Sequence, residues 1–237
     1  MPPRTLAIGD IHGCDFSLLR LLEHVGPQAD DTVIVLGDIV DRGAGTKEVV
    51  TALLELAERC QLVFIRGNHE EMLLNAVENR ATREAWLHYG GTQTLFSYGG
   101  ALDLIPQNHW DFLRSSIDLH ETATHIFTHA NLEAGVPLAE QSTEWLRWTH
   151  LDGEEQPWPT GQTVVVGHTP QRSGVPLVRP GWIGLDTFAW GGQWLTLLDV
   201  DSGRLFQANE RRQIRESHLS DHPPPPEPPS TAERATT

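Results

Sequence analysis

Short apolar runs, each followed within a few residues by an aspartate, an asparagine or a histidine, recur along the chain. The first three runs alternate with two segments in which apolar residues recur at helical spacing. The resulting order of strand, helix, strand, helix and strand is typical of parallel strands joined by crossover helices. We expect strands at residues 5–8, 32–36 and 62–65, helices at 15–25 and 46–59, and a closing hairpin formed by 194–200 and 204–208.

Five of these strand candidates end next to a residue that could bind a metal ion. In open α/β sheets, ligands gather beyond the carboxyl ends of the strands, so these side chains should lie close together. Their oxygen and imidazole donors suit manganese, iron or zinc, and six donors suit two ions better than one. A lone Gly-Asp is usually a turn and a lone buried histidine usually belongs to the core, but the repetition at five strand ends favours a metal site. The six residues are Asp10, His12, Asp38, Asn68, His129 and His168.

The motifs around these residues resemble those of a known family. The chain is similar to the metal-dependent phosphoprotein phosphatases of the calcineurin-like metallophosphoesterase superfamily, in particular to small bacterial and phage serine/threonine phosphatases. The resemblance implies an α/β fold, a four-layered α/β/β/α sandwich of two mixed sheets with the metal site at the carboxyl ends of the strands. It rests on the segments Gly9-Asp10-Ile11-His12-Gly13, Gly37-Asp38-Ile39-Val40-Asp41-Arg42-Gly43 and Gly67-Asn68-His69-Glu70.

The resemblance also implies roles for individual residues. One divalent ion would be held by Asp10, His12 and a bridging Asp38, and the second by Asp38, Asn68, His129 and His168. Manganese is the expected metal, with iron or zinc as alternatives, and a hydroxide bridging the ions is the expected nucleophile. His69 would be the general acid, oriented by Asp41. Arg42 and Arg66, together with Asn68, would bind the substrate phosphate.

Two further positions near these motifs are an additional phosphate-binding position and Glu70. Relatives carry a further phosphate-binding arginine between the last two histidine ligands, and the local sequence places either Arg147 or His150 there. Glu70 is expected to have a structural role at the start of a helix.

The expected activity is hydrolysis of phosphomonoesters, most specifically as a serine/threonine phosphoprotein phosphatase. Its substrates would be phosphorylated proteins or small phosphoesters. A diadenosine tetraphosphatase is an alternative within the same class, because it uses nearly the same motifs. A non-catalytic, metal-bound scaffold that recognises phosphorylated partners is an alternative from another class.

The composition of the chain indicates which binding partners and which cellular location to expect. The 237 residues include 17 lysines and arginines against 32 aspartates and glutamates, which gives a formal charge of −15. An acidic chain is a poor candidate for nucleic-acid binding. No apolar run approaches the roughly 20 residues that a membrane-spanning helix needs. We therefore expect a cytoplasmic monomer without a nucleic-acid or membrane partner.

Two segments lie outside the motif pattern. Residues 211–237 contain almost no apolar side chain and include the run 223–229 with six prolines, so we expect a disordered tail after a catalytic domain of residues 1–210. Residues 69–123 are expected to be mostly helical and carry no obvious chemistry. Whether residues 79–124 cap the site stays open.

Overall fold

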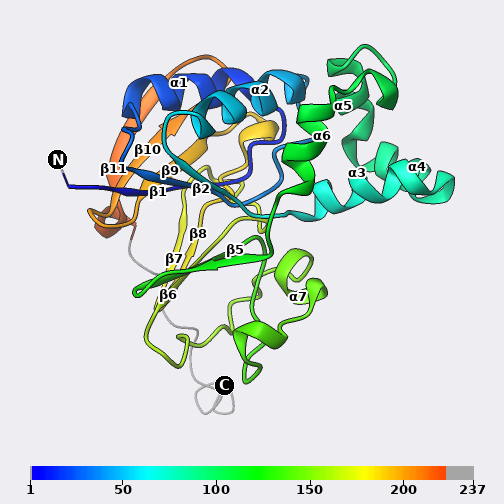
Figure 1. Cartoon of the computed structure of the whole chain (residues 1–237). Coiled ribbons are helices and arrows are strands. Elements are labelled where there is room, and N and C mark those ends of the chain that lie inside the picture. The colour runs from blue at the N-terminus through cyan, green and yellow to red at the C-terminus, as the bar shows by residue number, and fades with distance from the viewer. Residues whose placement is uncertain (1, 223–237) are drawn as a thin grey trace, which may run out of the picture.

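The computed structural model describes residues 2–222, which form two mixed sheets packed face to face (Figure 1). The first sheet has the order β11-β10-β9-β1-β2-β3 and the second the order β4-β5-β6-β8-β7. The strands of the first sheet are β1 (Thr5–Ile8), β2 (Thr32–Val35), β3 (Gln61–Phe64), β9 (Leu195–Asp199), β10 (Arg204–Ala208) and β11 (Ile214–His218). Those of the second are β4 (Leu119–Glu121), β5 (His125–Thr128), β6 (Thr163–Val166), β7 (Leu177–Arg179) and β8 (Trp182–Gly184).

The first sheet follows the expected β-α-β-α-β order. Strands β1, β2 and β3 are parallel, and they are joined by α1 (Asp15–Val25) and α2 (Thr46–Ala57), which cover the outer face of the sheet (Figure 1). Strands β9 and β10 form the expected hairpin, and β9 pairs antiparallel with β1. The parallel order brings the carboxyl ends of β1, β2 and β3 to the same edge of the sheet.

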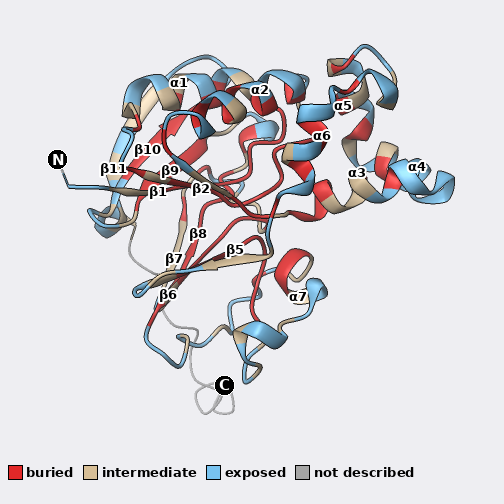
Figure 2. Ribbon diagram, in the orientation of Figure 1, coloured by how far each residue is buried: buried red, intermediate tan, exposed pale blue. Residues whose placement is uncertain are grey.

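Alternation along the strands fills three apolar layers, as the buried central strands in Figure 2 illustrate. Leu6 and Ile8 of β1 pack toward the helices, whereas Ala7 packs into the layer between the sheets. In β5 the side chain of Phe127 enters that middle layer, and Ile126 packs on the outer face of the second sheet. On that outer face the fourth layer consists of one short helix, α7 (Thr143–Arg147), and long loops.

A helical excursion follows β3, as the sequence predicts for this region. It contains α3 (Asn68–Glu78), α4 (Arg80–Trp86), a π-helical turn at Leu87–Gly91, α5 (Thr92–Ser97) and α6 (Gln107–Arg114). The expected helices and strands differ from the observed ones by at most two residues at their ends. For example, α2 ends at Ala57, whereas the sequence predicts a helix that continues to residue 59. None of the helices within residues 2–222 is both long and apolar enough to cross a membrane.

The predicted domain boundary at residue 210 is too early. Strand β11 pairs with β10 along five residues, and Glu216 of β11 accepts hydrogen bonds from His24 of α1 and from Arg204. The sequence of β11, Ile-Arg-Glu-Ser-His, has a single apolar residue because it lies at the edge of the sheet, so its composition resembles that of a tail. The proline run lies outside the described residues.

Asp31 ties the start of β1 to the start of β2 and provides a test of the fold. Its buried carboxylate accepts hydrogen bonds from the Arg4 guanidinium and from the backbone N–H groups of Arg4 and Gln28. Burial alone would raise the pKa of Asp31, but these hydrogen bonds outweigh it and lower the pKa. The unfolded chain therefore binds a proton more readily, so this contribution to stability is present above about pH 4 and is lost at lower pH.

We expect Asp31→Asn to lower the free energy of unfolding at pH 7 by about 1–3 kcal/mol, because buried donors lose a charged acceptor. The difference from wild type, measured by urea unfolding, should shrink as the pH falls from 5 toward 3. Asp30→Asn, at the exposed neighbouring position, is the matched control. A difference that persists unchanged at pH 3 would contradict this assignment.

Candidate metal centre and active site

The carboxyl ends of five strands bring the expected ligands together. Asp10 and His12 follow β1, Asp38 follows β2, Asn68 starts α3 directly after β3, and His129 and His168 follow β5 and β6. All six are buried. Two groups of side chains have candidate ligand atoms within 4.8 Å of one another: one is His12, Asp38 and His69, and the other is Asp38, His129 and His168.

Asp38 lies between the two groups. Its Oδ2 is 3.4 Å from His12 Nε2, and its Oδ1 is 3.5 Å from His129 Nε2. Burial alone would raise the pKa of Asp38, but the pKa lies below its usual range, and Oδ1 accepts the backbone N–H of His69 at 3.0 Å, which favours the charged form. Asp38 is therefore a carboxylate at neutral pH, which is the form that binds a metal ion.

The histidines present lone pairs toward this carboxylate. Nδ1–H of His12 donates to the Val40 carbonyl at 2.9 Å, and Nδ1–H of His129 donates to the Leu36 carbonyl at 2.7 Å. Burial lowers the pKa of both imidazoles, so each Nε2 is unprotonated. A backbone carbonyl that fixes the tautomer in this way is a common partner of a metal-binding histidine.

The donor set fits a cation. The unprotonated Nε2 of His129 lies 3.1 Å from Asn68 Oδ1 and 3.5 Å from Asp38 Oδ1, so three acceptors converge with no hydrogen between them. Asp10 accepts the backbone N–H of His168 at 3.1 Å. Nearby, Oδ2 of buried Asp186 has no hydrogen-bond partner among the described residues. Burial and the charges of Asp186 and Asp38 raise the pKa of Asp10, and divalent cations would relieve this repulsion.

The loops that carry these ligands hold non-glycine residues in the left-handed region. The φ angles are 46° at His12, 49° at Asp38 and 58° at His168. Such conformations persist only where neighbouring contacts fix them, and they cluster at functional sites. The glycines beside them allow close approach: a Cβ at Gly37 would lie 2.8 Å from His129 Nδ1, and one at Gly167 would lie 2.0 Å from Asp10 Oδ1.

Glu70 fixes the loop that contains Asp38. Its buried carboxylate accepts the backbone N–H groups of Asp38, Ile39 and Gly67 at 2.8–2.9 Å, and that of Val40 at 3.3 Å. It also completes a capping box at the start of α3. Glu70 thus has the structural role expected at this helix start, and it extends to the strand end that carries the central carboxylate.

His69 and Asp41 form a buried pair beside the ligands. Nδ1–H of His69 donates to Asp41 Oδ2 at 2.8 Å. The Asp41 carboxylate also accepts Trp86 Nε1–H at 2.9 Å and the Thr94 hydroxyl at 2.7 Å. These two donors come from α4 and α5, a region to which sequence reasoning assigned no chemistry. Within the short helix α4, whose other residues are alanine or polar, Trp86 is the one large apolar side chain, and it is fully buried.

Arg42 reaches the same space. Its guanidinium donates to His12 Nε2 and to His69 Nε2, both at 2.9 Å, and lies 4.6 Å from the ring centre of Trp190. Because His69 Nε2 accepts in this arrangement, the imidazole is neutral here. Burial alone would lower the pKa of His69, but Asp38 and Asp41 outweigh it and raise the pKa above its usual value.

The other proposed phosphate-binding residues lie in different surroundings. Arg66 donates through Nε to Ser116 Oγ and through Nη2 to the carbonyls of Arg114 and Ser116. Arg147 is buried in ion pairs with Glu71 and Asp118. His150 is exposed and stacks on His168, with ring centres 4.3 Å apart and planes inclined by 18°. Of the two alternatives, His150 is therefore the one that lies against an expected ligand.

Comparison with known proteins agrees with this geometry. The sequence profile of the family "Calcineurin-like phosphoesterase" matches residues 3–181, and the chain belongs to that family. The family uses a dinuclear metal centre, and the two His/Asp groups could hold its ions.

The relatives differ in the substrates for which they are named. Serine/threonine-protein phosphatase 1 of Salmonella typhimurium is 28% identical over 214 residues, or 81% of this chain and 90% of that protein. The symmetrical bis(5'-nucleosyl)-tetraphosphatase of Nitrosomonas europaea is 32% identical over 129 residues, or 54% of this chain and 44% of that protein. A crystal structure of a candidate diadenosine tetraphosphatase shares the fold, with a TM-score of 0.65, 22% identity and coverage of 92% and 96% of the two chains.

Glu70→Gln tests how the central carboxylate is held. A glutamine would keep one acceptor oxygen but would turn an NH₂ group toward backbone N–H groups, so the Asp38 loop should loosen. We expect Mn²⁺ affinity, measured by calorimetry on chelator-treated protein, to fall by about 10–100-fold for at least one ion. Glu78→Gln, at the exposed end of the same helix, is the control. Wild-type affinity in a folded Glu70→Gln protein would refute the role given to Glu70.

Proposed function

We propose that this protein is a metal-dependent phosphomonoesterase that acts on phosphoserine and phosphothreonine in proteins, with manganese as its preferred metal. The observation that carries the proposal is the intact His69–Asp41 pair next to Asp38, the carboxylate that the two groups of candidate ligand atoms share. The match to a serine/threonine phosphatase over most of both chains supports this substrate. The match to the tetraphosphatase includes less than half of that protein.

Each residue of the site would have a defined task. Asp10, His12 and Asp38 would hold one ion, and Asp38, Asn68, His129 and His168 the other. When bound, two divalent ions lower the pKa of a water molecule and neutralise charge on a phosphoryl group. Arg42 would turn its guanidinium fork from the two histidines to the phosphate oxygens. Arg66 has Nη1 left for a similar contact, because Nε and Nη2 are engaged.

His69 would supply the proton that the leaving alkoxide needs. Asp41 holds Nδ1–H at 2.8 Å, so that the proton to be transferred is carried on Nε2, the atom that faces Arg42. The carboxylates of Asp38 and Asp41 stabilise the charged imidazolium before transfer. A scaffold that only recognises phosphorylated partners would have no need of this buried pair, which argues for catalysis.

A substrate panel separates the candidate functions. We expect the protein, supplied with Mn²⁺, to hydrolyse phosphoserine and phosphothreonine peptides and p-nitrophenyl phosphate, and to lose this activity with a chelator. Diadenosine tetraphosphate should be a poorer substrate by kcat/KM. Rapid cleavage of the dinucleotide without turnover of phosphopeptides would favour the tetraphosphatase. No turnover of any phosphoester would favour the non-catalytic scaffold.

The role of His69 has its own test. We expect His69→Asn to retain Mn²⁺ binding by calorimetry but to lose at least about 100-fold in kcat on phosphopeptides, the usual scale for removal of a general acid. His88→Asn, at an exposed position in the helical excursion, should behave like wild type. Near-normal kcat in His69→Asn would exclude it as the acid.

A further inference from the structure

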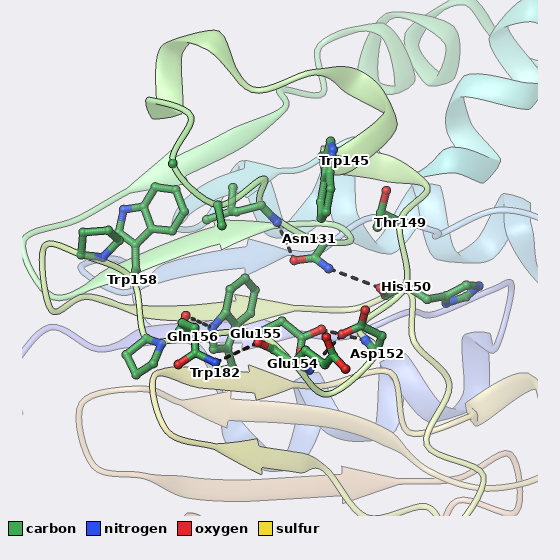
Figure 3. A pocket seen from close by; sticks show the side chains of 15 residues that line it. Asn131, Trp145, Thr149, His150, Asp152, Glu154, Glu155, Gln156, Trp158 and Trp182 are labelled. Atoms are coloured by element: carbon green, nitrogen blue, oxygen red, sulfur yellow. Dashed lines mark hydrogen bonds between the residues drawn. The ribbon is translucent and has the colours of Figure 1, made fainter. Parts of the chain in front are cut away.

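A hollow lies between α7 and the loop that follows it (Figure 3). It has a volume of about 270 Å³, and its walls include the indoles of Trp145, Trp158 and Trp182. His150 also lines it, and the His150 ring stacks on His168, one of the expected metal ligands. Only the side chain of His150 therefore lies between the hollow and the expected metal ligand His168. We call it the tryptophan pocket.

The tryptophan pocket is formed by a loop that is fastened to the second sheet. The Leu151 N–H donates to Thr169 Oγ1 at 2.9 Å, and Trp182 Nε1–H donates to the Gln156 carbonyl at 2.9 Å. The Glu155 carboxylate lies 3.6 Å from the Arg179 guanidinium. Because these contacts already order the loop, a ligand would not have to supply the free energy for ordering it.

The rim of the pocket carries negative charge that residues 2–222 do not fully neutralise. Asp152, Glu154 and Glu155 gather on the loop (Figure 3), and only Glu155 has a cationic partner within residues 2–222. The Glu154 carboxylate is exposed and has no hydrogen bond or ion pair in that part of the chain. Asp152 is exposed and accepts only the backbone N–H of Glu154. Two uncompensated carboxylates thus line the same hollow as the half-buried indoles of Trp145 and Trp158, with the buried Trp182 behind them.

Carboxylates combined with indole faces favour one kind of ligand. A guanidinium group can stack on an indole while it donates paired hydrogen bonds to a carboxylate. An ammonium gains from the same two contacts, although it lacks the flat fork. A purine base could also stack on indoles, but its attached polyphosphate would have to pass the two free carboxylates, in a chain whose formal charge is −15.

We propose that the tryptophan pocket binds a cationic side chain of the phosphoprotein substrate, arginine in preference to lysine. This inference rests on the proposed protein phosphatase activity and names the sequences it would favour. The basic residue would lie close to the phosphorylated residue in the peptide sequence, because His150 both lines the pocket and stacks on the expected ligand His168. The contact lies away from the reacting phosphorus, so it would lower KM more than it changes kcat.

The test compares phosphoserine peptides that differ at one position. Arginine is placed in turn at each of the three positions on either side of the phosphoserine, and each peptide is compared with its methionine counterpart, which is similar in length but uncharged. At one or more positions we expect the wild-type protein with Mn²⁺ to show a KM at least about tenfold lower for arginine. In the double variant Asp152→Asn/Glu154→Gln the arginine-to-methionine ratio should approach one. In Glu55→Gln/Glu58→Gln, which removes two exposed charges from the distant helix α2 and its end, the ratio should stay at the wild-type value.

Each outcome decides a different point. Equal KM values for all arginine and methionine peptides in wild type would overturn the inference and leave the phosphatase proposal intact. A ratio that survives in Asp152→Asn/Glu154→Gln would also overturn it, and thermal melting shows whether that variant is folded. Hydrolysis of p-nitrophenyl phosphate without turnover of any peptide would reject the proposed function and the inference together. Tryptophan quenching by diadenosine tetraphosphate that disappears in Trp158→Ala, without an arginine preference, would assign the pocket to a base instead.

Discussion

Asp38 places a carboxylate where the two sheets meet, and its oxygens face imidazole nitrogens from both of them. His12 belongs to the first sheet and His129 to the second, so their contacts with Asp38 join the two halves of the fold at the site. The backbone N–H of His69 donates to this buried carboxylate at 3.0 Å and favours its charged form. The left-handed turn at Asp38 and the hydrogen bond from its backbone N–H to Glu70 hold it there. A change that moved this carboxylate would disturb both ligand groups at once.

Four successive residues at the start of α3 connect this centre to the rest of the molecule. Asn68 faces His129, His69 bonds to Asp41, and Glu70 holds the Asp38 loop. Glu71 accepts hydrogen bonds from Arg147 and from Trp148 Nε1, which fastens α7 and the following loop to α3. The first turn of one helix thus contacts an expected ligand, the Asp41 carboxylate, the Asp38 loop and the segment next to the tryptophan pocket.

The sequence predicts the candidate site best where the functional residues lie next to a strand or helix that can be recognised from its pattern. The six expected ligands follow five strands within a few residues, so strand order and the parallel topology were enough to predict that these side chains lie at the same edge of the fold. The hydrogen-bond partners of Asp41 are brought to it by tertiary packing, and no sequence pattern indicates them. Trp86 and Thr94 are 45 and 53 positions from Asp41. Arg66 and Arg147 illustrate the same limit, because Ser116, Glu71 and Asp118 decide where these guanidinium groups point. The polar strand β11 was missed because an edge strand needs few apolar residues.

The dependence of Asp41 on Trp86 and Thr94 has a consequence for local unfolding. The segment that carries these donors also exposes Tyr89, Phe96 and Leu104, and it contacts the motif through the Arg42 N–H, which donates to the Gly90 carbonyl at 3.2 Å. None of the six expected ligands comes from α4 or α5, so these helices could open while the ligand set stays in place. Such an opening would release Asp41, and with it the orientation of His69, while the expected ligands stayed in place. Under the proposed mechanism, heat or low denaturant would then stop proton transfer before the two sheets separate.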